Sequence, residues 1–421
     1  MAKYIVEKSG PLKGEVQISG AKNAVLPLMA AALLAEEECV IRDVPSLRDV
    51  ALMKEILASL GSKIEELEEN IISIHTEDIL STEAEFELVN KMRASILVMG
   101  PLLARKGRAR IPLPGGCAIG ARPIDLHLKG FEALGAELVM GDNYVEAVAG
   151  PQGLIGETIY LDFPSVGATE NIMMAAVLAH GTTYIENAAE EPEIVDLANF
   201  LNKMGAKIKG AGTDTIKIEG VEFLKGAKHT VIPDRIEAAT FMLAAAITKG
   251  AIHICNAVPD HLKPVIAKLR ECGVRVEVGD DDLIVRGDLG PQVATDIKTL
   301  PYPGFPTDIQ SPFMAYLTTV EGASTVIETV FENRFMHVSQ LGKMGASIDT
   351  AGNKANIKGN AHLRGCQVMA TDLRAGAALV LAGLVADGKT EISEIYHIER
   401  GYEKFIEKFE ALGATITRVD D

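Results

Sequence analysis

The order of apolar and polar residues repeats about every 70 residues along this chain, and six copies of the pattern can be counted. Each copy begins with an Ala-rich apolar stretch, continues through a short β-branched stretch, and ends in an amphipathic stretch with helical period. A glycine then leads into a further strand, because glycine readily adopts the left-handed angle that ends helices. These glycines are Gly61, Gly135, Gly205, Gly273, Gly345 and Gly413.

The two helices of each copy differ in character. The first, as in residues 24–32 and 237–246, is apolar nearly all round and is therefore expected to be buried. The second, as in residues 402–409, keeps a polar face. Each copy predicts two helices packed on a small sheet, which places the chain in the α/β (α+β) class.

A chain of 421 residues is too long for one ordinary core, so the six copies are expected to form two domains of three. The predicted domains are residues 22–231, and residues 1–21 together with 232–421. Two strand-like stretches, Lys3 to Lys8 and Gly14 to Ser19, precede the first copy. We expect them to pair with the C-terminal strand, Ala414 to Val419, which would place both termini in the second domain.

Composition narrows the class of protein further. Hydrophobic residues make up 48 % of the chain, yet no apolar run approaches the roughly 18 residues of a membrane span, and no apolar signal core opens it. The net charge of −17 argues against general binding to nucleic acid or to anionic lipid. The five cysteines form no C-x-x-C pair, which favours a reducing cytoplasm over a disulfide or zinc framework. They are Cys39, Cys117, Cys255, Cys272 and Cys366.

Cations recur where the repeat predicts that helices start. For any one of them a surface salt bridge is the ordinary explanation. Together they would be costly without an anion, and helix N-termini attract anions, so we expect a multiply anionic ligand in a cleft shared by both domains. The cations on which this prediction rests are Lys22, Arg122, Arg334, Arg374 and Arg400.

Two further residues are candidates for chemistry. Cys117 lies in a Pro- and Gly-rich loop over residues 112–127, where the ordinary explanation is an incidental thiol. Asp308 follows a rigid Pro-rich turn at the start of a predicted helix, where it is either a helix-stabilising carboxylate or a general base. No Walker A sequence is present, and the nine histidines show no metal-ligand spacing, so no metal is expected.

Several motifs resemble those of the UDP-N-acetylglucosamine 1-carboxyvinyltransferases, a family of enolpyruvyl transferases, and the resemblance covers essentially the whole chain. The motif around Cys117 is the most specific, since we do not expect it in the sister enzymes that act on shikimate 3-phosphate. The motifs lie at residues 20–24, 114–127, 165–170, 306–308 and 371–376.

The resemblance implies a two-domain inside-out α/β barrel in the bacterial cytoplasm, with no cofactor. It implies transfer of the enolpyruvyl group of phosphoenolpyruvate to the 3-hydroxyl of UDP-N-acetylglucosamine, the first committed step of peptidoglycan synthesis. The residues implied for phosphoenolpyruvate are Lys22, Asn23, Arg122, Arg334, Arg374 and Arg400. The residues implied for the sugar nucleotide, with Asn23 shared, are Arg93, Arg122, Pro123, Ile124, Asp125, Leu126, His127, Ser165, Val166, Gly167, Asp308 and Val330.

In this interpretation Cys117 acts as general acid or covalent residue, and Asp308 as the base that activates the sugar hydroxyl. Fosfomycin, an epoxide mimic of phosphoenolpyruvate, is expected to alkylate Cys117. One departure is that many relatives have Lys-Val where this chain has Phe163-Pro164, so a cationic contact to the nucleotide is lost. Two alternatives stay open: transfer to another acceptor such as shikimate 3-phosphate, and a non-catalytic paralogue that binds UDP-sugar. The oligomeric state is not predicted.

Overall fold

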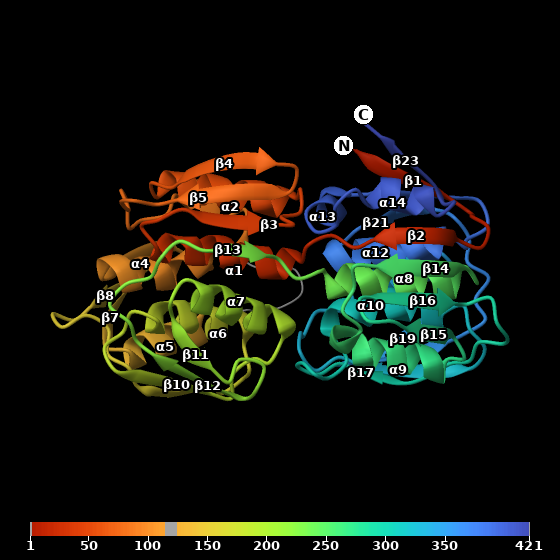
Figure 1. The fold of residues 1–421 in the computed structure, drawn as a ribbon. Helices are drawn as coiled ribbons and strands as arrows, with labels where there is room; N and C mark the ends of the chain where they lie inside the picture. The colour runs from red at the N-terminus through yellow and green to blue at the C-terminus, as the bar shows by residue number, and fades with distance from the viewer. Residues whose placement is uncertain (1, 114–123, 421) are drawn as a thin grey trace. The chain divides into compact units, whose positions relative to one another are not determined.

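The computed structural model describes residues 2–113 and 124–420, and its contacts divide them into two compact units. One unit contains residues 20–113 and 124–232, and the other contains residues 2–19 and 233–420 (Figure 1). Each unit has its own hydrophobic core. The predicted domains, residues 22–231 and residues 1–21 with 232–421, and the cleft expected between them stay a prediction. Among the described helices, none is both long and apolar enough to cross a membrane.

Three small sheets and the helices they enclose make up the unit of residues 20–232. The first sheet has the order β13-β3-β5-β4, the second β6-β8-β7, and the third β11-β12-β10-β9. The strands are β3 (Cys39–Arg42), β4 (Lys63–Glu68), β5 (Ile71–His75), β6 (Arg108–Pro112), β7 (Ala136–Met140), β8 (Tyr144–Ala149), β9 (Thr158–Tyr160), β10 (Thr182–Glu186), β11 (Lys207–Lys209), β12 (Thr215–Glu219) and β13 (Lys228–Thr230). The helices are α1 (Lys22–Ala31), η1 (Ala32–Leu34), α2 (Arg48–Ser59), α3 (Phe86–Val89), η2 (Arg93–Val98), α4 (Met99–Lys106), α5 (Asp125–Ala133), α6 (Val166–Ala176) and α7 (Pro192–Lys203).

The other unit is built in the same way. Its sheets have the orders β15-β16-β14-β2, β17-β18-β20-β19 and β21-β22-β1-β23. The strands are β1 (Lys3–Glu7), β2 (Lys13–Gln17), β14 (Ala251–Cys255), β15 (Arg275–Val278), β16 (Asp282–Arg286), β17 (Ile297–Lys298), β18 (Ala323–Ile327), β19 (Ser347–Ala351), β20 (Lys354–Lys358), β21 (Gln367–Met369), β22 (Lys389–Ser393) and β23 (Thr415–Val419). The helices are α8 (Arg235–Ile247), η3 (Pro259–Leu262), α9 (Lys263–Glu271), α10 (Thr307–Leu317), α11 (His337–Lys343), α12 (Leu373–Gly383), α13 (Tyr396–Glu399) and α14 (Phe405–Ala411).

The sheets confirm the sixfold repeat and the predicted α/β class. In most of them an antiparallel trio is joined by one parallel strand, as β10 pairs antiparallel with β12 and parallel with β9. In the sheet of β6, β7 and β8 the parallel position is reduced to a single bridge between Glu83 and Arg110. One structural unit therefore recurs, with a local simplification in its second copy.

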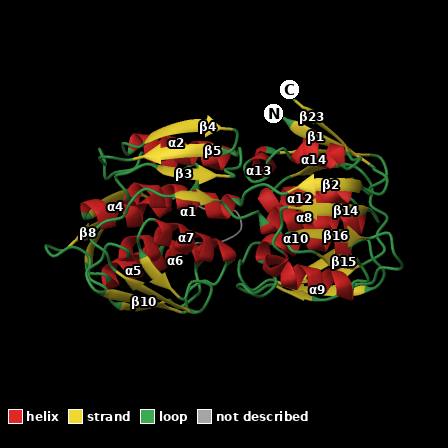
Figure 2. Cartoon of the chain, in the orientation of Figure 1, coloured by secondary structure: helices red, strands yellow, loops and turns green. Residues whose placement is uncertain are grey.

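The apolar first helices are buried in the centre of each unit, as their composition predicts. Every residue of α6 from Ala168 to Ala176 is buried, and so is every residue of α8 after Arg235. In the unit of residues 233–420, α8, α10 and α12 pack against one another. Figure 2 shows helices enclosed by strands within each unit, which is the inside-out arrangement that the family resemblance implies.

The two N-terminal strands go to different sheets. Strand β1 pairs antiparallel with β23, with Lys3 opposite Val419, as expected. The same expectation was wrong for β2, which pairs in parallel with β14 and places Glu15 opposite His253. The reason lies in the repeat: β14 needs a parallel neighbour, and the preceding segment, β13, already pairs with β3.

Candidate active site

A buried cluster of charges forms where α10 begins in the unit of residues 233–420. Asp308 is the second residue of α10, and its Oδ1 accepts a hydrogen bond from Arg334 Nη2 at 2.7 Å and from Arg374 Nε at 3.5 Å. Both arginine side chains are 4 % exposed, whereas Asp308 is 27 % exposed. Three predicted site residues, distant in sequence, are therefore in direct contact.

The charges in this cluster do not balance. Burial by itself would raise the pKa of Asp308, but Arg334 and then Arg374 more than offset it and hold that pKa well below its usual range. One carboxylate thus faces two guanidinium groups. Arg334 Nε and Arg374 Nη1 are buried and have no hydrogen-bond partner among the described residues. Buried donors without acceptors are costly, so the cluster is suited to a second anion.

A hydrogen-bond network holds the segment that carries Arg334. Thr307 Oγ1 accepts from Arg334 Nη1 at 3.2 Å and donates to Glu328 Oε2 at 2.9 Å. The other oxygen of Glu328 accepts from the backbone N–H groups of Val330 and Phe331 at 2.8 and 3.2 Å. Glu328 therefore orders the turn that contains Val330 and leads to Arg334.

The first turn of α12 presents Arg374. Asp372 caps this helix, since its Oδ1 accepts from the N–H groups of Arg374 and Ala375 at 2.9 and 3.0 Å. The Arg374 guanidinium also lies over the ring of Tyr402, 5.4 Å from the ring centroid. The cap and the ring together fix where the guanidinium points.

Arg400 does not start a helix, contrary to the expectation from the repeat. It follows the last residue of the short helix α13, and α14 begins only at Phe405. The last copy of the pattern divides its second helix into two, with Lys404 in the left-handed region at φ 48°. Arg400 therefore lies at the negative end of a helix, where a cation is favoured, and no helix dipole assists it in binding an anion.

In the unit of residues 20–232, Lys22 is the first residue of α1 and Asn23 the second. The Nζ of Lys22 pairs with Asp49 Oδ2 at 2.8 Å, and both side chains are largely buried. Asp49 lies in the first turn of α2. This pair joins the starts of two helices and orients the ammonium group of Lys22.

His127, on α5, is buried and neutral. Burial, and then the charge of Arg93, lower the pKa of His127 to about 4. Asn171 sets the tautomer, because its Oδ1 accepts from Gly100 N at 2.7 Å and its Nδ2 therefore donates to His127 Nδ1 at 3.0 Å. The proton is then on Nε2, the side of the ring that lies against Gly167, where a Cβ would be 3.5 Å from that atom. His127 is thus oriented as a hydrogen-bond donor.

The remaining predicted sugar-nucleotide residues lie at the starts of helices in the same unit. Ser165 caps α6 by accepting from Ala168 N at 3.3 Å, and Val166 and Gly167 follow it. Arg93 opens η2, Ile124 precedes α5, and Asp125 and Leu126 begin that helix. Cys117, Arg122 and Pro123 lie outside the described residues.

At the departure from the family pattern, Phe163 is 41 % exposed. A cation from a distant part of the sequence is nevertheless nearby, because Lys129 Nζ of α5 pairs at 2.6 Å with Oδ2 of Asp162, the residue before Phe163. Sequence reasoning also missed Asp49, Asn171 and Glu328. Asp49 directly follows a predicted helix start, which is a usable signal, whereas nothing in the sequence shows which side chains Asn171 and Glu328 contact.

One group of metal-ligating side chains is found among the described residues, but it contains none of the predicted site residues. It consists of Glu15, His253 and Cys255 on the sheet that contains β2 and β14. The cluster around Asp308 offers two cations to a single carboxylate, so its charge suits an anion and not a metal cation.

Comparison with known proteins gives consistent results. Residues 6–409 match the family described as EPSP synthase (3-phosphoshikimate 1-carboxyvinyltransferase). The chain is 63 % identical over 416 residues to UDP-N-acetylglucosamine 1-carboxyvinyltransferase 1 of Caldanaerobacter subterraneus subsp. tengcongensis, covering 99 % of both chains. It is 62 % identical to UDP-N-acetylglucosamine 1-carboxyvinyltransferase 2 of Carboxydothermus hydrogenoformans, covering all of both chains.

Solved structures agree with the sequence comparisons. The enolpyruvyl transferase NikO of Streptomyces tendae superposes with a TM-score of 0.90 at 25 % identity, covering 99 % of both chains. An EPSP synthase of Acinetobacter baumannii shares the fold, with a TM-score of 0.77 at 18 % identity over all of both chains. The chain therefore belongs to the EPSP synthase family of enolpyruvyl transferases, together with relatives named UDP-N-acetylglucosamine 1-carboxyvinyltransferases.

Proposed function

We propose that this chain transfers the enolpyruvyl group of phosphoenolpyruvate to the 3-hydroxyl of UDP-N-acetylglucosamine and releases phosphate. The observation that supports it most is the identity of 62–63 % to full-length relatives named for this acceptor. The buried cluster of Asp308, Arg334 and Arg374 supports the same proposal, because it needs a second anion. A cytoplasmic location and a role at the start of bacterial peptidoglycan synthesis belong to the same proposal.

In the proposed reaction the sugar oxygen attacks C2 of phosphoenolpyruvate while C3 gains a proton. The tetrahedral intermediate then loses phosphate from C2 and the proton from C3, which restores the double bond. Cys117 is the proposed acid at C3 and can also add to C2 through its thiolate. Lys22, Arg122 and Arg400 are proposed to bind the phosphate group. Their positive charges would stabilise the negative charge that develops as phosphate leaves C2.

The carboxylate of phosphoenolpyruvate is assigned to Arg334 and Arg374. Each presents a buried N–H without a partner among the described residues, and Arg–carboxylate pairing makes two charge-assisted bonds with a planar fork. A carboxylate at this position would also bring the net charge of the cluster to zero. This assignment accounts for why two arginines are buried beside one aspartate.

Asp308 is the proposed base for the sugar hydroxyl, but its pKa is too low for efficient proton transfer while both arginines face it alone. The substrate carboxylate resolves this conflict. Because it pairs with the same guanidinium groups, it weakens their attraction for Asp308. The pKa of Asp308 therefore rises. Asp308 would then become an effective base only in the complex that contains phosphoenolpyruvate.

The sugar nucleotide is assigned to the helix starts of the other unit, where His127 contributes a neutral donor at Nε2. Helix N-termini at α5 and α6 suit the diphosphate, since their N–H groups point outward with partial positive charge. Proton transfer and anion neutralisation are all that addition and elimination require here, and the side chains named above supply both.

The decisive experiment measures phosphate release from phosphoenolpyruvate by the full chain. We expect release that depends on UDP-N-acetylglucosamine and not on shikimate 3-phosphate. Asp308→Asn and Cys117→Ala should each lower kcat at least a hundredfold while sugar-nucleotide binding persists. Asp288→Asn is the matched control, because Asp288 is also paired with an arginine, Arg286, but on an exposed strand end.

Three results would contradict the proposal. Full activity in both Asp308→Asn and Cys117→Ala would refute the mechanism. Release that depends on shikimate 3-phosphate would support the alternative acceptor that the family description names. Binding of UDP-N-acetylglucosamine without turnover by the unmodified chain would indicate a regulatory paralogue.

A further inference from the structure

Four polar side chains, Glu15, His253, Cys255 and Asp282, lie together on the outer face of the sheet β15-β16-β14-β2. His253 and Cys255 are two residues apart on β14, so both point to the same face. Glu15 of β2 is directly opposite His253, and Asp282 of β16 is directly opposite Cys255. Their neighbours Ile252 and Ile254 are fully buried, which confirms that these four point away from the core.

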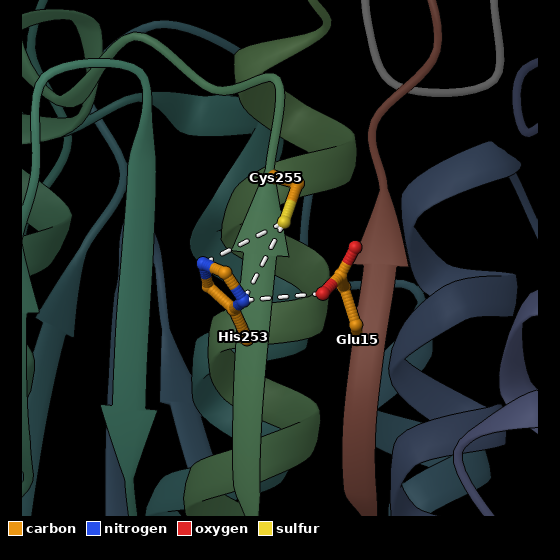
Figure 3. Close-up of side chains that lie close together, drawn as sticks. All are labelled: Glu15, His253 and Cys255. Atoms are coloured by element: carbon orange, nitrogen blue, oxygen red, sulfur yellow. Dashed lines mark hydrogen bonds and ion pairs between the residues drawn. The ribbon is translucent and has the colours of Figure 1, made fainter.

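The atoms of this group face one another. His253 Nδ1 is 3.4 Å from Glu15 Oε2, and Cys255 Sγ is 3.6 Å from both ring nitrogens of His253, Nδ1 and Nε2. All three ligand atoms lie within 4.8 Å of one another, and Figure 3 shows them converging from two adjacent strands. Among the described residues, no lysine or arginine forms an ion pair with this group, whose polar contacts are with one another and with Asp282.

We propose that Glu15, His253 and Cys255 bind a zinc ion or a similar borderline divalent cation, with water at the fourth position. Tetrahedral zinc with ordinary bond lengths separates a nitrogen from an oxygen ligand by about 3.4 Å, and a nitrogen from a sulfur ligand by about 3.6 Å. Glu15 Oε2 already lies at the first distance from His253 Nδ1. Cys255 Sγ is equally far from Nε2, so it would reach the ion only after rotation about the Cα–Cβ bond of Cys255. Glu15 is exposed, so its side chain can rotate and place a carboxylate oxygen where it binds the same ion as Cys255 Sγ.

Asp282 completes the arrangement without binding the metal. Its Oδ2 accepts from His253 Nε2 at 2.6 Å, which keeps the ring proton on Nε2 and leaves the Nδ1 lone pair for the cation. A carboxylate behind a ligating histidine is the usual support of zinc sites and increases the basicity of the ring. On binding, Cys255 loses its thiol proton to solvent, so that thiolate and carboxylate together neutralise the two charges of the ion.

The consequence for the fold is a bridge between distant parts of the chain. Glu15 belongs to the N-terminal strand, whereas His253 and Cys255 lie about 240 residues later. The ion would therefore link β2 to β14 in addition to the backbone hydrogen bonds between these strands. The site includes no residue assigned to the transfer reaction, so its occupancy can be tested independently of turnover.

The test uses the full chain, freed of metal by chelation and titrated with Co²⁺. We expect one Co²⁺ per chain and a near-ultraviolet thiolate-to-cobalt absorption band that Zn²⁺ abolishes by displacement. Cys255→Ser should eliminate the band, and Glu15→Gln should weaken binding at least tenfold. Asp282→Asn should weaken it about 10–100-fold while the band persists, because Asp282 only orients the ligand.

Cys366→Ser is the matched control, since Cys366 is another half-buried thiol of the same unit and should leave band and affinity unchanged. Zn²⁺ at a hundredfold excess over its Kd should also raise the Tm of the unmodified chain by about 5 °C, and not that of Cys255→Ser. The proposal is overturned if Cys255→Ser keeps the band, if Glu15→Gln binds as tightly as the unmodified chain, or if less than half an equivalent of Co²⁺ binds.

Discussion

Asp308 is a carboxylate whose neighbours decide how readily it accepts a proton. In the structure two buried arginines face it and keep its pKa well below the usual range. A base with so low a pKa accepts protons poorly. The proposed role of Asp308 as a base is consistent with this low pKa only if the carboxylate of phosphoenolpyruvate also pairs with Arg334 and Arg374. Substrate binding and activation of the base would then be one event.

Cysteine reactivity provides a prediction at the same scale. Cys39 and Cys272 are buried, and burial raises their pKa to about 11 and about 12, so neither is expected to react as a thiolate. We expect fosfomycin to form a single adduct on Cys117, which peptide mass mapping would locate. The Cys117→Ala variant should form none. An adduct on Cys39 or Cys255 would contradict the assignment of Cys117.

The orientation of His127 gives a second residue-level prediction. In Asn171→Asp the carboxylate would accept from Nδ1–H, so the ring proton would move from Nε2 to Nδ1. We expect the KM for UDP-N-acetylglucosamine to rise about tenfold with a smaller change in kcat, because one hydrogen bond of about 1–1.5 kcal/mol is lost. Nitrogen NMR of His127 should report the exchanged tautomer.

The control for this variant is Asn202→Asp in the same unit. Asn202 also bonds through both amide atoms, but only to the backbone of Ile208. It should lose stability without a specific change in KM. An unchanged His127 tautomer in Asn171→Asp would refute the proposed orientation.

At the scale of elements, helix caps fix the residues that the proposed site uses. Asp234, Ser165 and Asp372 cap α8, α6 and α12, and each is followed within two residues by a predicted site residue or a cation. The cap of α12 is the most informative, because its two hydrogen bonds end on Arg374 and its neighbour. Capping and positioning of the guanidinium are therefore coupled.

Asp372→Ala should lower the free energy of unfolding by about 1 kcal/mol and raise the KM for phosphoenolpyruvate. Asp372→Ser should restore most of the stability, since serine also caps helices. Urea denaturation and steady-state kinetics of the two variants would measure both effects. If the Ser variant is as unstable as the Ala variant, Asp372 stabilises the fold through its charge and not through the helix cap.

At the scale of the whole molecule, buried titratable groups act on stability in opposite directions. Burial lowers the pKa of His127 and of His337 from 6.5 to about 4, so the unfolded chain binds more protons in that interval and stability rises with pH. Burial raises the pKa of Glu237 from 4.5 to about 7, so there the folded chain binds more and stability falls with pH. Between pH 4.5 and 6.5 the two histidines outweigh Glu237, so the balance of these three contributions makes stability rise with pH.

Glu170 can disturb this balance in a measurable way. Burial, and then Glu193 and Glu191, raise its pKa well above 4.5, so it makes the fold less stable as pH rises above 4.5. In Glu170→Gln this loss is absent. The free energy of unfolding of the variant, relative to the unmodified chain, should increase by up to about 1.4 kcal/mol per pH unit.

Guanidinium denaturation at pH 5.5, 6.5 and 7.5 would test this prediction. Glu219→Gln is the control, because Glu219 is exposed and its pKa is lowered by Lys217. Its difference from the unmodified chain should be the same at all three pH values. A Glu170→Gln difference that does not change with pH would show that Glu170 is ionised in the fold.

The sequence by itself determined the sixfold repeat, the buried and amphipathic helices, and the α/β class. These features depend on local periodicity, which each copy of about 70 residues contains in full. It also predicted that Asp308 faces the same ligand as five cations, Lys22, Arg122, Arg334, Arg374 and Arg400. Arg334 and Arg374 contact Asp308 in the structure, and the rest of that set stays a prediction.

Only the tertiary structure decided which strands pair and which polar groups meet. The place of β2 beside β14, Asp49 beside Lys22, Asn171 beside His127, and the convergence of Glu15, His253 and Cys255 all depend on register between separate segments. Side-chain partners across a sheet change completely when the register shifts by one residue, and local periodicity does not specify that register. Metal-ligating residues on separate strands therefore leave no spacing motif in the sequence.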